Sequence, residues 1–161
     1  MRPDSTRDGP CLLPDYRAVM EAFANYVSTQ RPLLQSPEDT ARLMRPILTP
    51  CEQEEMHALL LDAKNGLIAD AGLTTGLADR TQIHPREAFR EAIRVSCSRI
   101  ILVHHHPSGD PTPSAQDIAA TRQLVEAGKI VGIEVLDHIV LGTRTPTRLR
   151  DFVSFRQENL L

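Results

Sequence analysis

The chain has 161 residues, of which 41% are hydrophobic and 24% are charged, and its formal net charge is −3. A domain of this length buries about two thirds of the surface that its unfolded chain exposes, so it can fold without disulfides or a structural metal. The 18 Lys and Arg residues stand against 21 Asp and Glu, which argues against the basic excess that drives general nucleic-acid binding.

Cysteine usage and hydropathy predict a cytoplasmic protein. Cys11, Cys51 and Cys97 are far apart and form no CxxC pair, so they are interpreted as reduced thiols. No apolar run approaches the ~18 residues of a membrane span, and the N-terminus lacks the apolar stretch of a signal peptide. We therefore expect no membrane association.

Residues 1–46 are predicted to form a flexible arm and a helical preamble. The first 14 residues contain Pro3, Pro10 and Pro14 among polar side chains. Apolar residues from 16 to 27 recur at helical spacing, which predicts an amphipathic helix. Ser36-Pro37-Glu38-Asp39 is typical of a helix start, and Pro46 and Pro50 limit the helix that follows.

Residues 47–161 are predicted to form a separate α/β domain, because strand and helix patterns alternate along them. Asn65-Gly66 predicts a tight turn and hence an antiparallel hairpin, so the sheet is expected to be mixed and flanked by helices. The predicted elements are strands at 56–62 and 67–69, a helix at 84–95, a strand at 99–103, a helix at 114–127 capped by Gly128, and a strand within 131–141.

Three residues after the buried strand suit a metal ion. His104 and His106 are two residues apart at a strand end, so both imidazoles leave the same face while His105 points the other way. Asp117 follows at the third position of the next helix. Two imidazoles and one carboxylate favour zinc with an open fourth position, which is typical of a catalytic site. Ser114 to Asp117 also fits a helix capping box, and the two roles are compatible.

The same residues resemble a known family. His104-x-His106, seven residues, Ser114, two residues and Asp117 is similar to the JAMM (MPN-plus) metal motif, and VHHHPSGDPTPSAQD resembles its bacterial RadC branch. DAKNGLIAD at 62–70, HPREAFREAI at 84–93 and VEAGKIVGIEVLDHIVLG at 125–142 resemble the same branch. The resemblance implies a JAMM/MPN fold related to cytidine deaminases and a zinc ion held by His104, His106 and Asp117.

The resemblance also implies two catalytic residues. Ser114 would lie beside the reacting water and the developing oxyanion, and an acid before the first core strand would act as the base. Glu52, Glu54 and Glu55 are the candidates, and relatives of this branch favour Glu55. Because Glu54 and Glu55 lie on opposite faces of an extended chain, a one-residue change of register exchanges them. His84 and His138 are expected to lie outside the metal's direct ligands.

The predicted function is that of a zinc-dependent peptidase or isopeptidase acting on an unidentified protein or peptide. A DNA-repair-associated accessory protein with a structural or vestigial metal is the alternative, and an interaction scaffold is a third. Longer relatives carry an N-terminal helix-hairpin-helix-like module for which this chain is too short. Together with the acidic balance, this predicts weak or no DNA binding.

Overall fold

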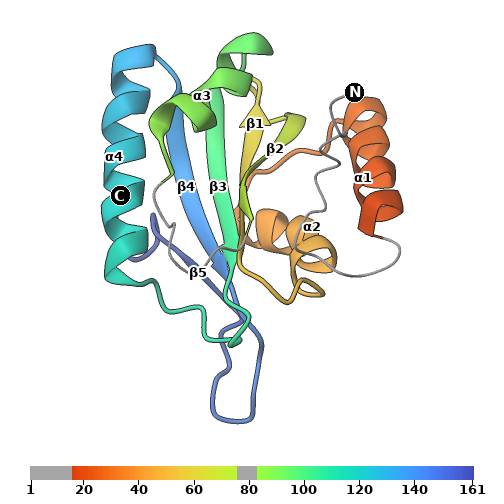
Figure 1. Cartoon of the computed structure of the whole chain (residues 1–161), viewed down its shortest axis with the longest axis vertical. Coiled ribbons are helices and arrows are strands. Elements are labelled where there is room, and N and C mark those ends of the chain that lie inside the picture. The colour runs from red at the N-terminus through yellow and green to blue at the C-terminus, as the bar shows by residue number, and fades with distance from the viewer. Residues whose placement is uncertain (1–15, 76–82) are drawn as a thin grey trace, which may run out of the picture.

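Five strands form one mixed sheet that separates two layers of helices (Figure 1). The computed structural model describes residues 16–75 and 83–161. The strand order is β2-β1-β3-β4-β5, and only β3 and β4 are parallel neighbours. The predicted α/β class with a mixed sheet is confirmed. The elements are α1 (Tyr16–Gln30), α2 (Pro37–Leu48), β1 (Glu55–Leu61), β2 (Leu67–Thr75), α3 (Pro85–Arg94), β3 (Arg99–His105), α4 (Ala115–Val131), β4 (Glu134–Leu141) and β5 (Phe152–Ser154).

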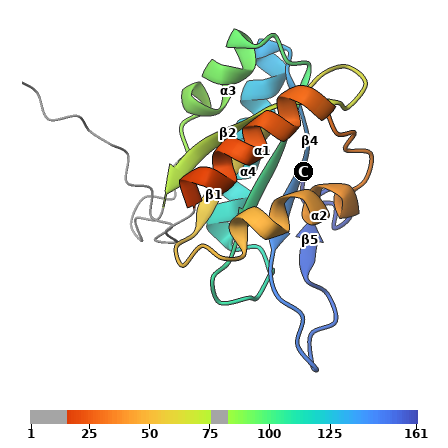
Figure 2. The same ribbon diagram turned by 90° about the vertical axis from the view of Figure 1, so that its right-hand side faces the viewer.

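Each face of the sheet has its own hydrophobic core. Side chains of α1 and α2 pack on one face, which lies toward the viewer in Figure 2, against Leu59, Ile101 and Ile139. Side chains of α3 and α4 pack on the other face against Leu60 and Leu102. The strands β1 and β3 are apolar on both faces because both are covered, so their sequences lack the alternation of a half-exposed strand.

The predicted hairpin is confirmed and its turn has a clear local cause. Asn65 adopts the left-handed conformation at φ 63°, which asparagine tolerates better than most residues. The Asp62 carboxylate accepts hydrogen bonds from the backbone of Lys64 and Gly66. This turn fixes the register in which β2 pairs with β1.

Helix α4 is longer than the sequence predicts. It continues past Gly128 to Val131 and ends at Gly132, whose φ of 76° is the left-handed cap conformation. Gly128 instead allows a close approach, because a Cβ there would lie 2.4 Å from the carbonyl oxygen of Ile133. The cap that the sequence predicts at Gly128 is therefore wrong, and this glycine allows α4 to pack closely on the segment leading into β4.

The N-terminal helices pack directly on the sheet. Phe23 and Val27 of α1 and Met44 and Leu48 of α2 are buried in the first core. The division into residues 1–46 and 47–161 stays a prediction, and the arm predicted at residues 1–14, Cys11 included, lies outside the described residues. Among the described helices, none has the length and hydropathy needed to cross a membrane.

Candidate metal centre

His104, His106 and Asp117 meet where β3 ends and α4 begins. The Nε2 atoms of His104 and His106 lie 3.0 Å apart. Each Nε2 is 3.5 Å from one oxygen of the Asp117 carboxylate. Glu54 adds a fourth donor, with its Oε1 atom 3.8 Å from Nε2 of His104. One atom from each of the four residues lies within 4.8 Å of the others, so the group is able to hold a metal ion.

The hydrogen bonds of the imidazoles leave lone pairs at the centre of this cluster. Nδ1 of His106 donates to the carbonyl of Asp110 at 2.6 Å, and Nδ1 of His104 lies 2.7 Å from Nε2 of His138. With the proton of each imidazole on Nδ1, both Nε2 atoms are acceptors, and they face each other across 3.0 Å. Two facing lone pairs repel unless a cation lies between them, so the donor set fits a divalent metal.

The carboxylate of Asp117 is tuned to stay ionised. Burial acts to raise its pKa, but the neighbouring imidazoles of His104 and His106 and the hydrogen bond from the backbone of Ser114 outweigh burial and hold the pKa far below its usual range. The adjacent Asp117 carboxylate raises the pKa of His106. Below that pKa a proton competes for the position between the imidazoles and the carboxylate, so metal affinity should fall as the pH falls.

Ser114 lies at the start of α4 and forms the predicted capping box with Asp117. Its Oγ accepts a hydrogen bond from the backbone of Asp117 at 3.1 Å, and its own N–H donates to the Asp117 carboxylate at 2.7 Å. The cap therefore fixes the orientation of the carboxylate, with Oδ1 3.5 Å from Nε2 of His104 and Oδ2 3.5 Å from Nε2 of His106. The hydroxyl proton of Ser114 remains available for another acceptor.

Glu54, and not the predicted Glu55, is the acid at this cluster. In the antiparallel pairing of β1 with β3, Met56 lies opposite His104, and directly paired residues share a face. Alternation along the chain then puts Glu54 on the face of His104 and Glu55 on the opposite face. Glu55 is 1% exposed and accepts a hydrogen bond from Tyr16 at 2.8 Å. The assignment of Glu55 to the site is thus corrected.

Glu55 belongs to a buried network on the α1 face. His57 lies between Glu55, at 3.3 Å, and Asp70, at 2.9 Å. Burial acts to lower the pKa of His57, but the two carboxylates outweigh it and raise the pKa to about 10. His105 also turns to this face, as predicted, and its Nε2 donates to the carbonyl of Cys51. The network joins α1 to β1 and β2 on the face of the sheet opposite the metal cluster.

Replacing His57 with Gln is expected to change how stability depends on pH. A folded pKa of about 10 against an unfolded pKa of about 6.5 means that the stabilisation is complete below pH 6.5 and is lost as the pH rises toward 10. The free energy of unfolding of the wild type should therefore fall by up to about 5 kcal/mol over that interval, and the His57→Gln variant should lack most of this decline. Urea unfolding at a series of pH values measures it.

The exposed His84, at the start of α3, provides the control for that experiment. His84→Gln should keep the pH dependence of the wild type. An equal decline in the wild type and the His57→Gln variant would contradict the proposed charge on His57.

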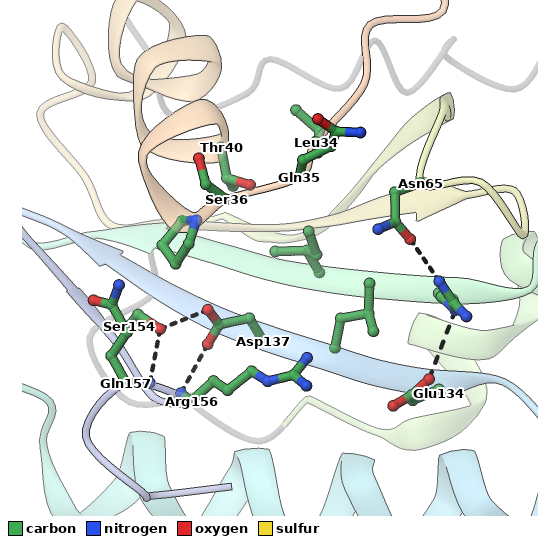
Figure 3. Close-up of a pocket in the computed structure, with 14 residues that line it drawn as sticks. Leu34, Gln35, Ser36, Thr40, Asn65, Glu134, Asp137, Ser154, Arg156 and Gln157 are labelled. Carbon is green, nitrogen blue, oxygen red and sulfur yellow. Dashed lines mark hydrogen bonds and ion pairs between the residues drawn. The ribbon is translucent and has the colours of Figure 1, made fainter.

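A cavity of about 650 Å³ lies on the α2 face of the sheet, away from the metal cluster (Figure 3). The carboxylate of Asp137 projects toward it and accepts hydrogen bonds from the Ser154 hydroxyl at 2.6 Å and from the backbone of Arg156 at 3.0 Å. The buried carboxylate of Asp137 is thus already paired with groups of the protein. Asp137 also accepts from the backbone of His138 at 2.7 Å, so the cavity wall fixes the neighbouring residue of β4.

His138 contacts Nδ1 of His104, on the opposite side of that ring from the Nε2 atom that faces His106. The pairing of β4 with β3 shifts by one residue between Val135 and Asp137, which is a β-bulge that reverses the faces of the residues after it. Asp137 therefore faces the cavity and His138 faces α4 and His104. The sequence predicts His138 outside the direct ligands and gives it no role, and its one sequence signal is its place in a block resembling the RadC branch.

The chain is similar to a family of bacterial proteins. A family model described as RadC-like JAB domain matches residues 34–160. A UPF0758 protein from Desulforamulus reducens is 41% identical over 145 residues, which are 88% of this chain and 64% of that protein. A UPF0758 protein from Desulforudis audaxviator is 45% identical over 145 residues, 88% of this chain and 63% of that protein. The chain thus spans less than two thirds of the length of these relatives.

Proposed function

This chain belongs to the RadC-like JAB domain family, and from that premise we propose that it is a zinc-dependent hydrolase of peptide or isopeptide bonds. The observation that carries the proposal is the pair of facing Nε2 atoms, 3.0 Å apart, beside the ionised carboxylate of Asp117. A single cation satisfies all three groups at once.

The donor set favours zinc among divalent metals. Zinc accepts two imidazoles and one carboxylate in tetrahedral geometry, and catalytic zinc sites have three protein ligands and one open position. His104, His106 and Asp117 would hold the ion. Calcium and magnesium prefer all-oxygen sites, which this cluster does not offer.

Two residues of the chain, Glu54 and Ser114, would have catalytic roles beside the metal. Zinc bound here would supply a Lewis acid that polarises the substrate carbonyl and lowers the pKa of water. Glu54, whose side chain is 40% exposed, can accept the proton of the attacking water on Oε1 and return it to the leaving nitrogen. Ser114 can donate its hydroxyl proton to the oxygen that gains charge in the transition state, because its lone pair already serves the cap of α4.

We assign an unmodified or branched polypeptide as the substrate and a reducing compartment, the cytoplasm, as the location. Cys51 and Cys97 are buried thiols, which suits that compartment. The net charge of −3 supports a polypeptide over a nucleic acid, so duplex DNA at low salt is expected to bind weakly or not at all.

Metal removal and restoration test the function. Purified protein should contain about one zinc per chain and should cleave members of a peptide mixture that includes lysine-linked isopeptides, with new amino termini detected by mass spectrometry. A chelator should abolish cleavage and added zinc should restore it. Protein that binds no zinc, or zinc-loaded protein that cleaves none of these bonds, would contradict the proposal.

A further inference from the structure

A series of hydrogen bonds connects Nδ1 of His104 to α4, the helix that carries Asp117. Nδ1 of His104 lies 2.7 Å from Nε2 of His138, and Nδ1 of His138 lies 2.6 Å from Oγ1 of Thr121. Oγ1 of Thr121 donates to the carbonyl of Asp117 at 2.6 Å. His104, His138 and Thr121 are all 0% exposed, so bulk water does not compete for these bonds.

Counting protons along this series of hydrogen bonds decides which atom is the donor and which is the acceptor in each bond. A carbonyl oxygen has no proton to give, so the hydroxyl proton of Thr121 lies on its bond to Asp117. Thr121 can then only accept from His138, whose proton must be on Nδ1. In a neutral imidazole the other nitrogen is an acceptor, so Nε2 of His138 accepts from Nδ1 of His104.

His138 is neutral because of its surroundings. Its ring is fully buried and stacks on Phe155, with the ring centroids 4.5 Å apart. Its two nitrogens meet another imidazole and a hydroxyl, and neither partner carries a negative charge. An imidazolium without a paired anion is costly in such a place.

We propose that Thr121 and His138 are positioning residues that select the tautomer of His104, keeping its Nε2 lone pair directed at the metal. This inference rests on the proposed metal site and extends it to two residues outside the proposed ligands. The bulge in β4, the stacking of Phe155 and the bond from the His138 backbone to Asp137 hold His138 in place. Residues that orient a metal-binding imidazole commonly affect metal affinity as strongly as 10- to 100-fold.

Thr121→Val tests the proposal by removing the hydroxyl while keeping the shape of the side chain. Without an acceptor at Thr121, the proton of His138 would form a better hydrogen bond on Nε2, from which it would donate to Nδ1 of His104. The proton of His104 would then be on its Nε2, the atom that faces the proposed metal position. We expect zinc affinity, measured by chelator competition, to fall about 10- to 100-fold. Thr121→Ser restores the hydroxyl and should bind zinc like the wild type.

Thr40 offers a matched control, because it is also a helical threonine with 0% exposure, but it lies on α2 across the sheet. Thr40→Val should leave zinc affinity unchanged. Equal zinc affinity in the wild type and Thr121→Val would overturn the proposal, and so would an equal loss in Thr40→Val.

A second measurement needs neither zinc nor a variant. Two-bond proton–nitrogen correlations of the imidazoles in the metal-free wild type report the tautomer of each histidine. His138 is expected to carry its proton on Nδ1, and a proton on Nε2 would overturn the proposal. This readout does not depend on zinc or hydrolysis. It can therefore contradict the positioning role while the proposed function holds, and it can support the positioning role even if the protein hydrolyses no peptide bond.

Discussion

Glu54→Gln is expected to lower kcat for peptide hydrolysis by about 10²- to 10⁴-fold, the usual contribution of a general base, while the protein keeps its zinc. The amide of Gln has nearly the shape of the carboxylate but cannot accept the proton of the attacking water. Zinc retention follows if Glu54 acts on the water and the other three residues hold the ion. Steady-state kinetics together with metal analysis of the same preparation measure both quantities.

Glu55→Gln is the matched control, because it makes the same chemical change one residue away. Its carboxylate bonds to Tyr16 and His57 on the other face of β1, so this variant should lose stability and keep kcat within a few-fold of the wild type. If Glu55→Gln abolishes hydrolysis while Glu54→Gln retains it, Glu55 is the base and the assignment from strand register is wrong.

Asp117→Asn is expected to lower zinc affinity by more than the roughly 100-fold upper range seen for residues that only support a ligand. The amide oxygen of Asn can still accept the bond from the backbone of Ser114, so the start of α4 should remain capped. The negative charge between the two imidazoles is lost. Chelator competition measures the affinity, and thermal unfolding of the zinc-free protein reports the cap.

The second capping box of the protein provides the control for this variant. Ser36 and Asp39 form the same reciprocal bonds at the start of α2, with no histidine in them. Asp39→Asn should cost a similar amount of stability and leave zinc binding unchanged. A matching loss of zinc in both variants would mean that helix capping, and not ligation by Asp117, explains the effect.

Local patterns predicted the parts of the site that lie close together in the sequence. The two-residue spacing of His104 and His106 was sufficient to put both imidazoles on one face, because side chains alternate along a strand. The short loop to Ser114 and the capping box brought Asp117 back toward them. Such features depend on backbone geometry over a few residues, which the sequence encodes directly.

Pairing between distant strands decided the parts that the sequence left open. Glu54 and Glu55 are equally acidic and adjacent, and only the register that pairs Met56 with His104 selects between them. That register depends on the packing of both cores against the helices, which no local pattern specifies. The strand β5 was also missed, because its three residues are too few to carry a periodic signal.

The bulge near Leu136 has a consequence for how this protein tolerates insertions and deletions. Ile100 of β3 pairs with Val135 and Ile101 pairs with Asp137, so Leu136 is one extra residue of β4 relative to its partner strand. Loss of Leu136 would leave both pairs in regular alternation and keep Asp137 toward the cavity and His138 toward α4. An insertion between Asp137 and His138 would instead move His138 to the cavity face and away from His104, although all of the proposed zinc ligands would remain in the sequence. Length variation in this family should therefore be limited to Leu136 within β4 and otherwise accumulate in loops such as the one that projects between β4 and β5 (Figures 1 and 2).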